Sequence, residues 1–229
     1  MKILVTGCGR SCTNWISEIV KATKKFNWVG IPEDRNLFNR LHLPDRYATK
    51  LAVEHPSFTE SNLKALGEIN PDLRILWSVK HPVANVMAKI YRGRPASEGG
   101  DKVTENISVD GFIETAILAV RKSFDLIQNV PVDTMIVKLE ELINKKRLII
   151  DSMGAFMKMH PTKIRIDAFE KTPNRYQLAR YGKSVDKSQA EIYNNWETAY
   201  DGYFADKKDL IEKAKEELQD VAEFFKYEL

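Results

Sequence analysis

Short apolar runs alternate with longer amphipathic stretches along most of the chain. The apolar runs predict strands at residues 2–6, 47–53, 74–79 and 134–139. Apolar positions spaced three and four residues apart predict helices at 14–25, 59–69, 83–91, 110–129, 147–158, 188–201 and 206–227. Two segments are polar and rich in turn-forming residues, which predicts a lid at 92–107 and a loop at 160–188. Strands that alternate with helices predict an α/β fold with three layers, α/β/α, around a mainly parallel central sheet.

Composition and charge narrow the class of protein. With 229 residues, 43% hydrophobic and 29% charged, the chain is long and apolar enough for one folded domain over residues 1–229. The net charge of +3 and the lack of a basic stripe with interleaved aromatics argue against a nucleic-acid partner. No apolar run reaches the roughly 18 residues that span a membrane, and no signal sequence opens the chain, so we expect no membrane partner and a cytoplasmic location.

The segment TGCGRSCTNW, residues 6–15, is the strongest candidate for chemistry. It follows an apolar run and precedes a predicted helix, where a loop presents unpaired N–H groups to an anion. Two glycines permit tight turns, and Arg10 adds a fixed positive charge. The Walker pattern GxxxxGK fails because Cys12 and Thr13 stand where a glycine and a lysine are required, and the dinucleotide pattern GxGxxG fails at Cys12 as well. The sequence therefore predicts an anion site that is neither of these.

Three segments resemble those of the sulfotransferase family. GRSCTNW resembles its 5′-phosphosulfate loop, KHPVANVMAKIYR resembles its 3′-phosphate segment, and VKLEELI at 137–143 is similar to its later strand-to-helix segment. The resemblance implies a P-loop NTPase-like sulfotransferase fold. It also implies transfer of a sulfuryl group from 3′-phosphoadenosine 5′-phosphosulfate (PAPS) to a hydroxyl or amine of a small-molecule, glycan or peptide acceptor, with PAPS as co-substrate and no metal.

The resemblance also implies which residues form the site. Those expected to bind the cofactor are Gly9, Arg10, Ser11, Cys12, Thr13, Asn14, Lys80, Arg180 and Lys183. Arg10 is also expected to neutralise the charge that builds on the leaving phosphate. The family places a base just after its second strand, where this chain has Glu54 and His55. We favour His55 by a small margin, because an imidazole titrates near neutral pH without help from burial.

Departures from the family pattern leave two other functions open. Cys12 replaces a glycine of the loop, Lys80 replaces an arginine, and Ala88 replaces a serine. One alternative is a non-catalytic nucleotide- or anion-binding protein whose site has degenerated. The other is a small-molecule kinase, which would need Mg²⁺ although the chain lacks the Walker lysine. For the adenine, Phe58 is a weak candidate, while Trp15 and Trp196 are expected in the core.

Overall fold

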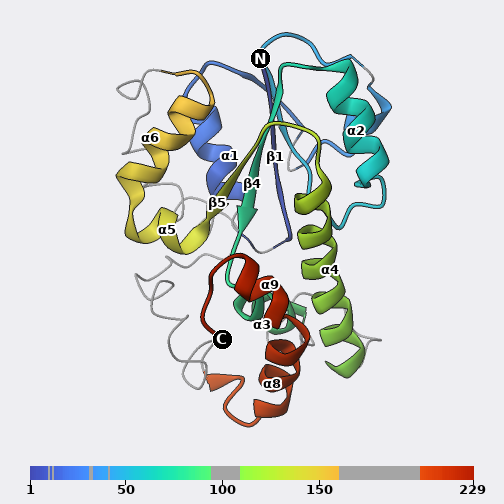
Figure 1. Cartoon of the computed structure of the whole chain (residues 1–229), viewed down its shortest axis with the longest axis vertical. Helices are drawn as coiled ribbons and strands as arrows, with labels where there is room; N and C mark the ends of the chain where they lie inside the picture. Colours follow the sequence, from blue (N-terminus) through green and yellow to red (C-terminus); the bar gives the residue numbers. More distant parts are fainter. Residues whose placement is uncertain (10, 12, 31–32, 41, 94–108, 160–201) are drawn as a thin grey trace. The chain divides into compact units, whose positions relative to one another are not determined.

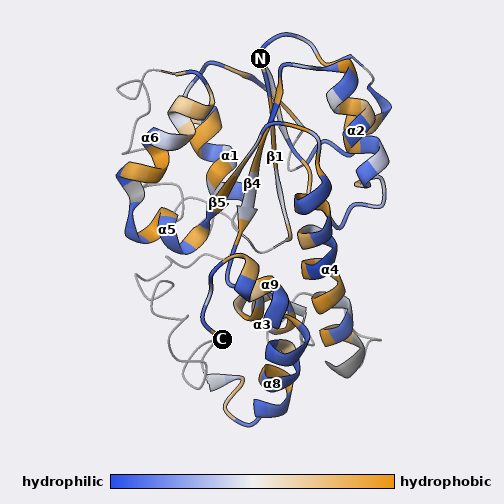
Figure 2. Cartoon of the chain, in the orientation of Figure 1, coloured by the Kyte–Doolittle hydropathy of each residue, from blue (hydrophilic) through white to orange (hydrophobic). Residues whose placement is uncertain are grey.

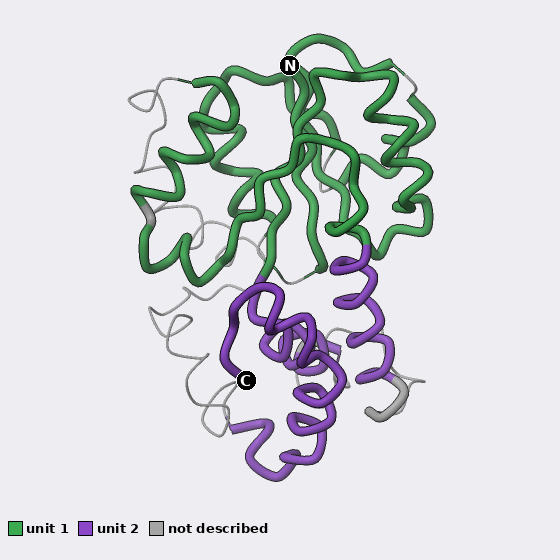
Figure 3. The backbone as a smooth tube through the Cα atoms, viewed as in Figure 1, with its two compact units in different colours: residues 1–79, 126–186 green, residues 80–125, 187–229 purple. Residues whose placement is uncertain are grey.

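The computed structural model describes residues 1–9, 11, 13–30, 33–40, 42–93, 109–159 and 202–229 (Figure 1). The chain divides into two compact units, which we describe separately (Figure 3). The first unit comprises residues 1–79 and 126–186, and the second comprises residues 80–125 and 187–229. The expectation of a single domain over residues 1–229 stays a prediction.

The first unit is built on a five-stranded sheet. Its strands are β1 (Lys2–Gly7), β2 (Asn27–Val29), β3 (Tyr47–Lys50), β4 (Leu73–Val79) and β5 (Thr134–Lys138). They follow the order β2-β3-β1-β4-β5, and every pair of neighbours is parallel. All six residues of the central strand β1 are buried, which explains its continuous apolar sequence.

Helices cover both faces of this sheet. Apolar residues of α1 (Thr13–Ala22), α5 (Leu139–Asn144) and α6 (Lys146–Phe156) form one core with alternate residues of the strands, and α2 (Glu60–Ile69) lies on the opposite face (Figure 1). Figure 2 shows hydrophobic and hydrophilic positions on each of these helices, as expected for helices with one buried face. The α/β fold with three layers around a parallel sheet is therefore confirmed.

The second unit is helical in its described residues. It contains α3 (Pro82–Gly93), most of α4 (Val109–Asn129), α8 (Lys208–Glu217) and α9 (Gln219–Phe224). Phe124 of α4 packs edge-on against Phe224 and Phe225, and Arg121 lies 3.2 Å from a carboxylate oxygen of Asp220. These contacts hold the chain's last helix against α4.

Most predicted elements are present, with some different boundaries. The helix predicted at 14–25 ends at Ala22, because Lys24 adopts a left-handed conformation with φ of 52°. The single helix predicted at 206–227 is two, since Leu218 leaves the helical conformation at φ −122° and ψ 18°. The strand predicted at 47–53 ends at Lys50, and residues 92–93 belong to α3 and not to a loop. The helix at 188–201, the loop at 160–188 and residues 94–107 of the lid lie outside the described residues.

A buried polar cluster attaches the segment before β3 to the sheet. Asp34 accepts a hydrogen bond from the hydroxyl of Tyr47, and its Oδ2 lies 2.6 Å from Nη1 of Arg40. The backbone N–H of Asp34 also donates to the carbonyl of Lys50 at 2.9 Å. Only 4% of Asp34 and 1% of Tyr47 are exposed. A buried carboxylate is stable here because the guanidinium of Arg40, the hydroxyl of Tyr47 and the N–H of Asn36 surround it.

This cluster predicts a loss of stability at alkaline pH. Burial raises the pKa of the Tyr47 hydroxyl above its ordinary value of 10, and the hydrogen bond to Asp34 raises it further. The unfolded chain therefore loses this proton first as the pH rises. The contribution of Tyr47 is constant below about pH 10 and falls above it. The free energy of unfolding, measured in urea, should decline less above about pH 10 in Tyr47→Phe than in the wild type. At neutral pH the variant should be about 1–2 kcal/mol less stable. An equal decline of the free energy of unfolding in the variant and the wild type above about pH 10 would contradict this prediction.

Candidate anion site at the first loop

The loop after β1 turns sharply and is tied to β4. Gly7 has φ of +146°, and a Cβ built there would lie 2.3 Å from the carbonyl oxygen of Ser78. Ser11 closes the turn, since its hydroxyl donates to the carbonyl of Cys8 at 2.5 Å and its N–H donates to the same oxygen at 3.1 Å. The hydroxyl of Ser78 donates to the carbonyl of Ser11. The loop is therefore held in one shape by residues that are all buried.

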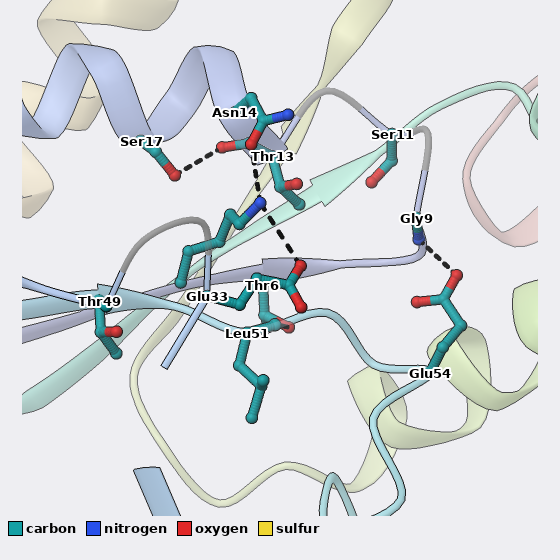
Figure 4. Close-up of polar contacts among 12 residues, drawn as sticks. Thr6, Gly9, Ser11, Thr13, Asn14, Ser17, Glu33, Thr49, Leu51 and Glu54 are labelled. Carbon is teal, nitrogen blue, oxygen red and sulfur yellow. Dashed lines mark hydrogen bonds and ion pairs between the residues drawn. The ribbon is translucent and has the colours of Figure 1, made fainter. Parts of the chain in front are cut away.

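Helix α1 begins directly behind this loop, at Thr13. Its first turn contains no acidic residue, and the N–H groups of a helix's first turn carry a partial positive charge. Ser17 stabilises this turn by donating to the carbonyl of Thr13 at 2.8 Å (Figure 4). The start of α1 is thus electrostatically suited to an anion.

A buried lysine reaches the same place from the neighbouring strand. Lys50 is the last residue of β3, and 5% of it is exposed. Its Nζ donates to Oδ1 of Asn14 at 2.7 Å and lies 3.4 Å from Oε1 of Glu33; these contacts are dashed in Figure 4. Our sequence reasoning did not assign Lys50 to the site. The sequence signal that could have assigned it is a lysine at the carboxyl end of a predicted strand. The carboxyl ends of parallel strands share one edge of the sheet, and the loop after β1 lies at that edge too.

Of the two candidate bases, Glu54 touches the loop. The N–H of Gly9 donates to Oε1 of Glu54 at 2.6 Å (Figure 4). Sγ of Cys8 lies 3.6 Å from the same oxygen. His55 comes next in the chain, and its Nδ1 accepts a hydrogen bond from the N–H of Ser57 at 3.3 Å. The structure therefore places both candidates beside the loop, with Glu54 in direct contact.

An open cavity of about 480 Å³ adjoins the loop. Its lining residues come from the loop, from the segment before β3 and from the turn after it: Gly9, Glu33, Arg35, Ala52, Glu54, His55 and Pro56. Both candidate bases border this space. A molecule in the cavity would lie against the loop's backbone.

The other predicted site residues lie in the second unit, in the core or outside the described residues. Lys80 belongs to the second unit, directly before α3, with 9% of it exposed. Phe58 is completely buried and packs edge-on against Phe38 and Trp77, so it is a core residue and offers no face to an adenine. Ala88 is buried in α3. Four residues predicted to bind the cofactor lie outside the described part of the chain: Arg10, Cys12, Arg180 and Lys183.

Neither a metal-ligand cluster nor a membrane-spanning helix occurs in the part of the chain that the structure describes. Among the residues with described positions, no three His, Cys, Asp or Glu side chains gather as metal ligands would. No helix in that part of the chain is long and apolar enough to cross a membrane. The expected cytoplasmic location stays a prediction.

Comparison with known proteins identifies the fold. No family model matches the sequence, and no curated protein matches it. Solved structures do match. Mouse sulfotransferase SULT7A1 complexed with PAP has a TM-score of 0.62 at 13% identity, covering 98% of this chain and 88% of that one. The sulfotransferase domain from the curacin biosynthetic pathway has a TM-score of 0.59 at 13% identity, and the match covers 99% of this chain and 98% of that one.

A third match is sulfotransferase STF9 from Mycobacterium avium, with a TM-score of 0.57 at 10% identity, covering 100% of this chain and 77% of that one. All three similarities extend over nearly the whole of this chain. At such low identity they establish the fold alone. The chain has a sulfotransferase fold.

Proposed function

We propose that the protein is a sulfotransferase that moves a sulfuryl group from PAPS to a hydroxyl or amine acceptor. The observation that carries the proposal is the first loop of a sulfotransferase fold, with the buried ammonium group of Lys50 at the start of α1. One protein of similar fold is complexed with PAP. A buried cation next to a helix N-terminus is the arrangement that a phosphosulfate needs.

The proposed roles follow from where the charges lie. Lys50 and Arg10 neutralise the charge that develops on the 5′-phosphate as the bridging S–O bond breaks. Asn14 holds the ammonium group of Lys50 at the start of α1 through its 2.7 Å hydrogen bond. Ser11 keeps the loop in shape, because its hydroxyl is already bonded to Cys8. This chemistry is mostly positioning and electrostatic stabilisation.

We assign the base to Glu54 in preference to His55. Its contact with the N–H of Gly9 places a carboxylate next to the loop and at the edge of the cavity. The acceptor hydroxyl would form the new O–S bond while its proton passes to Glu54, and the electron pair of the broken bond would leave with the 5′-phosphate. A turnover assay across pH would distinguish the two: Glu54→Gln should abolish activity, whereas His55→Gln should retain it.

Calorimetric titration tests the proposed cofactor. The wild-type protein should bind 3′,5′-diphosphoadenosine without a metal, and Arg10→Ala should bind it about tenfold more weakly, as expected for loss of one charge-assisted contact. Binding of ATP that requires Mg²⁺ would instead support the kinase. Failure to bind either nucleotide would contradict the proposal.

One observation favours a non-catalytic anion-binding protein as the second candidate. The carboxylate of Glu54 already accepts the hydrogen bond of Gly9, and like charges repel, so an incoming phosphosulfate competes with it. Tight binding of diphosphoadenosine without turnover of any acceptor would support this second function. Release of diphosphoadenosine from PAPS in the presence of an acceptor would exclude it.

A further inference from the structure

The cavity beside the loop has an unusual balance of charge. Among the lining residues that the structure describes, Glu33 and Glu54 are acidic and Arg35 is the one arginine or lysine. Glu54 comes from the turn after β3 and Glu33 from the segment before it, so the two carboxylates reach the cavity from different parts of the chain (Figure 4). A cavity that faces a site for a highly anionic cofactor therefore carries negative charge of its own.

We propose that this cavity accepts a cationic acceptor, an amino alcohol or amino sugar, and that Glu33 binds its ammonium group. The inference rests on the proposed function, because it names the acceptor class of that reaction. The hydroxyl to be sulfated would lie at Glu54 and Gly9, next to the loop. The ammonium group would lie at Glu33, on the neighbouring part of the lining.

The contacts of Glu33 support this assignment. Its Oε1 lies 3.4 Å from Nζ of Lys50, which is long for a charge-assisted hydrogen bond, whereas the same Nζ is 2.7 Å from Asn14. Lys50 is thus held more closely by the start of α1 than by Glu33. An anion bound there would draw the ammonium group further from Glu33. The carboxylate, with 24% of its side chain exposed, would then be stabilised by a cation from the acceptor.

Electrostatics also exclude the opposite class of acceptor. An acidic acceptor would meet two carboxylates and the charge of the cofactor within one small cavity. Among the described lining residues, one exposed guanidinium, that of Arg35, opposes these negative charges. The volume of about 480 Å³ falls within the range of sites for small molecules, so the acceptor is a compact molecule or the terminal group of a larger one.

The transfer step balances with such an acceptor. The hydroxyl oxygen forms the new bond to sulfur, its proton passes to the carboxylate of Glu54, and the bridging S–O bond breaks with its electron pair on the 5′-phosphate. The ammonium group keeps its proton throughout. The product carries one positive and one negative charge, which weakens its attraction to Glu33 and favours release.

Three sugars of matched size and different charge test the proposal. With the protein saturated by 3′,5′-diphosphoadenosine, we expect glucosamine to bind about tenfold more tightly than glucose, and glucuronate more weakly than both, by calorimetry. Glu33→Gln should remove this preference, so that glucosamine and glucose bind with about equal affinity. Glu68→Gln, the same change at an exposed residue of α2 away from the cavity, should keep the full preference.

The other outcomes are equally decisive. Equal binding of the three sugars, tightest binding of glucuronate, binding of none, or an unchanged preference in Glu33→Gln would overturn the inference. Failure of diphosphoadenosine to bind would overturn the proposed function separately. If the sugars, titrated without nucleotide, still showed the preference and lost it in Glu33→Gln, the cation site would stand without the sulfotransferase.

Discussion

Gly7→Ala should destabilise the protein by about 3 kcal/mol and abolish binding of diphosphoadenosine. The φ of Gly7 is +146°, a backbone conformation that residues with a side chain rarely adopt. The added Cβ would also lie 2.3 Å from the carbonyl oxygen of Ser78 and 2.8 Å from Oγ of Ser11. The oxygen of Ser78 belongs to the backbone of β4, so it cannot move without disturbing the sheet. The midpoint and slope of urea unfolding measure the loss of stability.

Gly67→Ala is the matched control for this change. Its new Cβ would lie 2.6 Å from a methyl group of Val132, a side chain that can turn away, and alanine favours the helix α2. We expect its free energy of unfolding to stay within about 1 kcal/mol of the wild type. If Gly7→Ala were as stable as Gly67→Ala and still bound the nucleotide, the loop would not have the rigid shape described here.

The central elements could be predicted because their sequence pattern depends on burial alone. β1 and β4 are covered on both faces, which leaves a continuous apolar run in each. β2 could not be predicted, because its three residues, Asn27–Val29, are too few to show an alternation of apolar and polar positions. It is also an edge strand and includes an exposed position. The periodicity also did not predict α5, since its six residues follow β5 without a break, and only the resemblance of 137–143 to a strand-to-helix segment indicated a helix there. Local patterns thus identify the core better than the edges.

The site could be predicted only in part, because its contacts join residues distant in the chain. The loop was found from its own sequence, whereas Lys50 meets Asn14 across 36 positions and Glu54 meets Gly9 across 45. Both contacts depend on the register of β3 against β1, in which Lys50 pairs with Val5. A sequence pattern does not specify that register. The positions of Glu33 and Arg35 at the cavity follow from the fold for the same reason.

Lys50→Met should weaken the binding of diphosphoadenosine by about 100-fold, the largest effect that we expect from a single side chain outside the loop. Methionine keeps much of the length and apolar volume but removes the charge. In a buried position the lost attraction to a phosphate is greater than at the surface, since water screens it less. Calorimetric titration measures the loss, and the salt dependence of binding should become shallower in the variant.

Lys2→Met separates this effect from general damage to the sheet. Lys2 is also a buried lysine, with 9% exposed, and its Nζ pairs with Oδ1 of Asp72 at 2.5 Å. It lies at the amino end of β1, the opposite edge of the parallel sheet from Lys50 at the carboxyl end of β3. Each variant removes a buried ammonium group from an ion pair with a partly exposed carboxylate, so the two should lose similar stability, about 1 kcal/mol. Only Lys50→Met should lose affinity, because only that ammonium group lies at the start of α1. Equal affinities in the two variants would mean that the anion binds elsewhere.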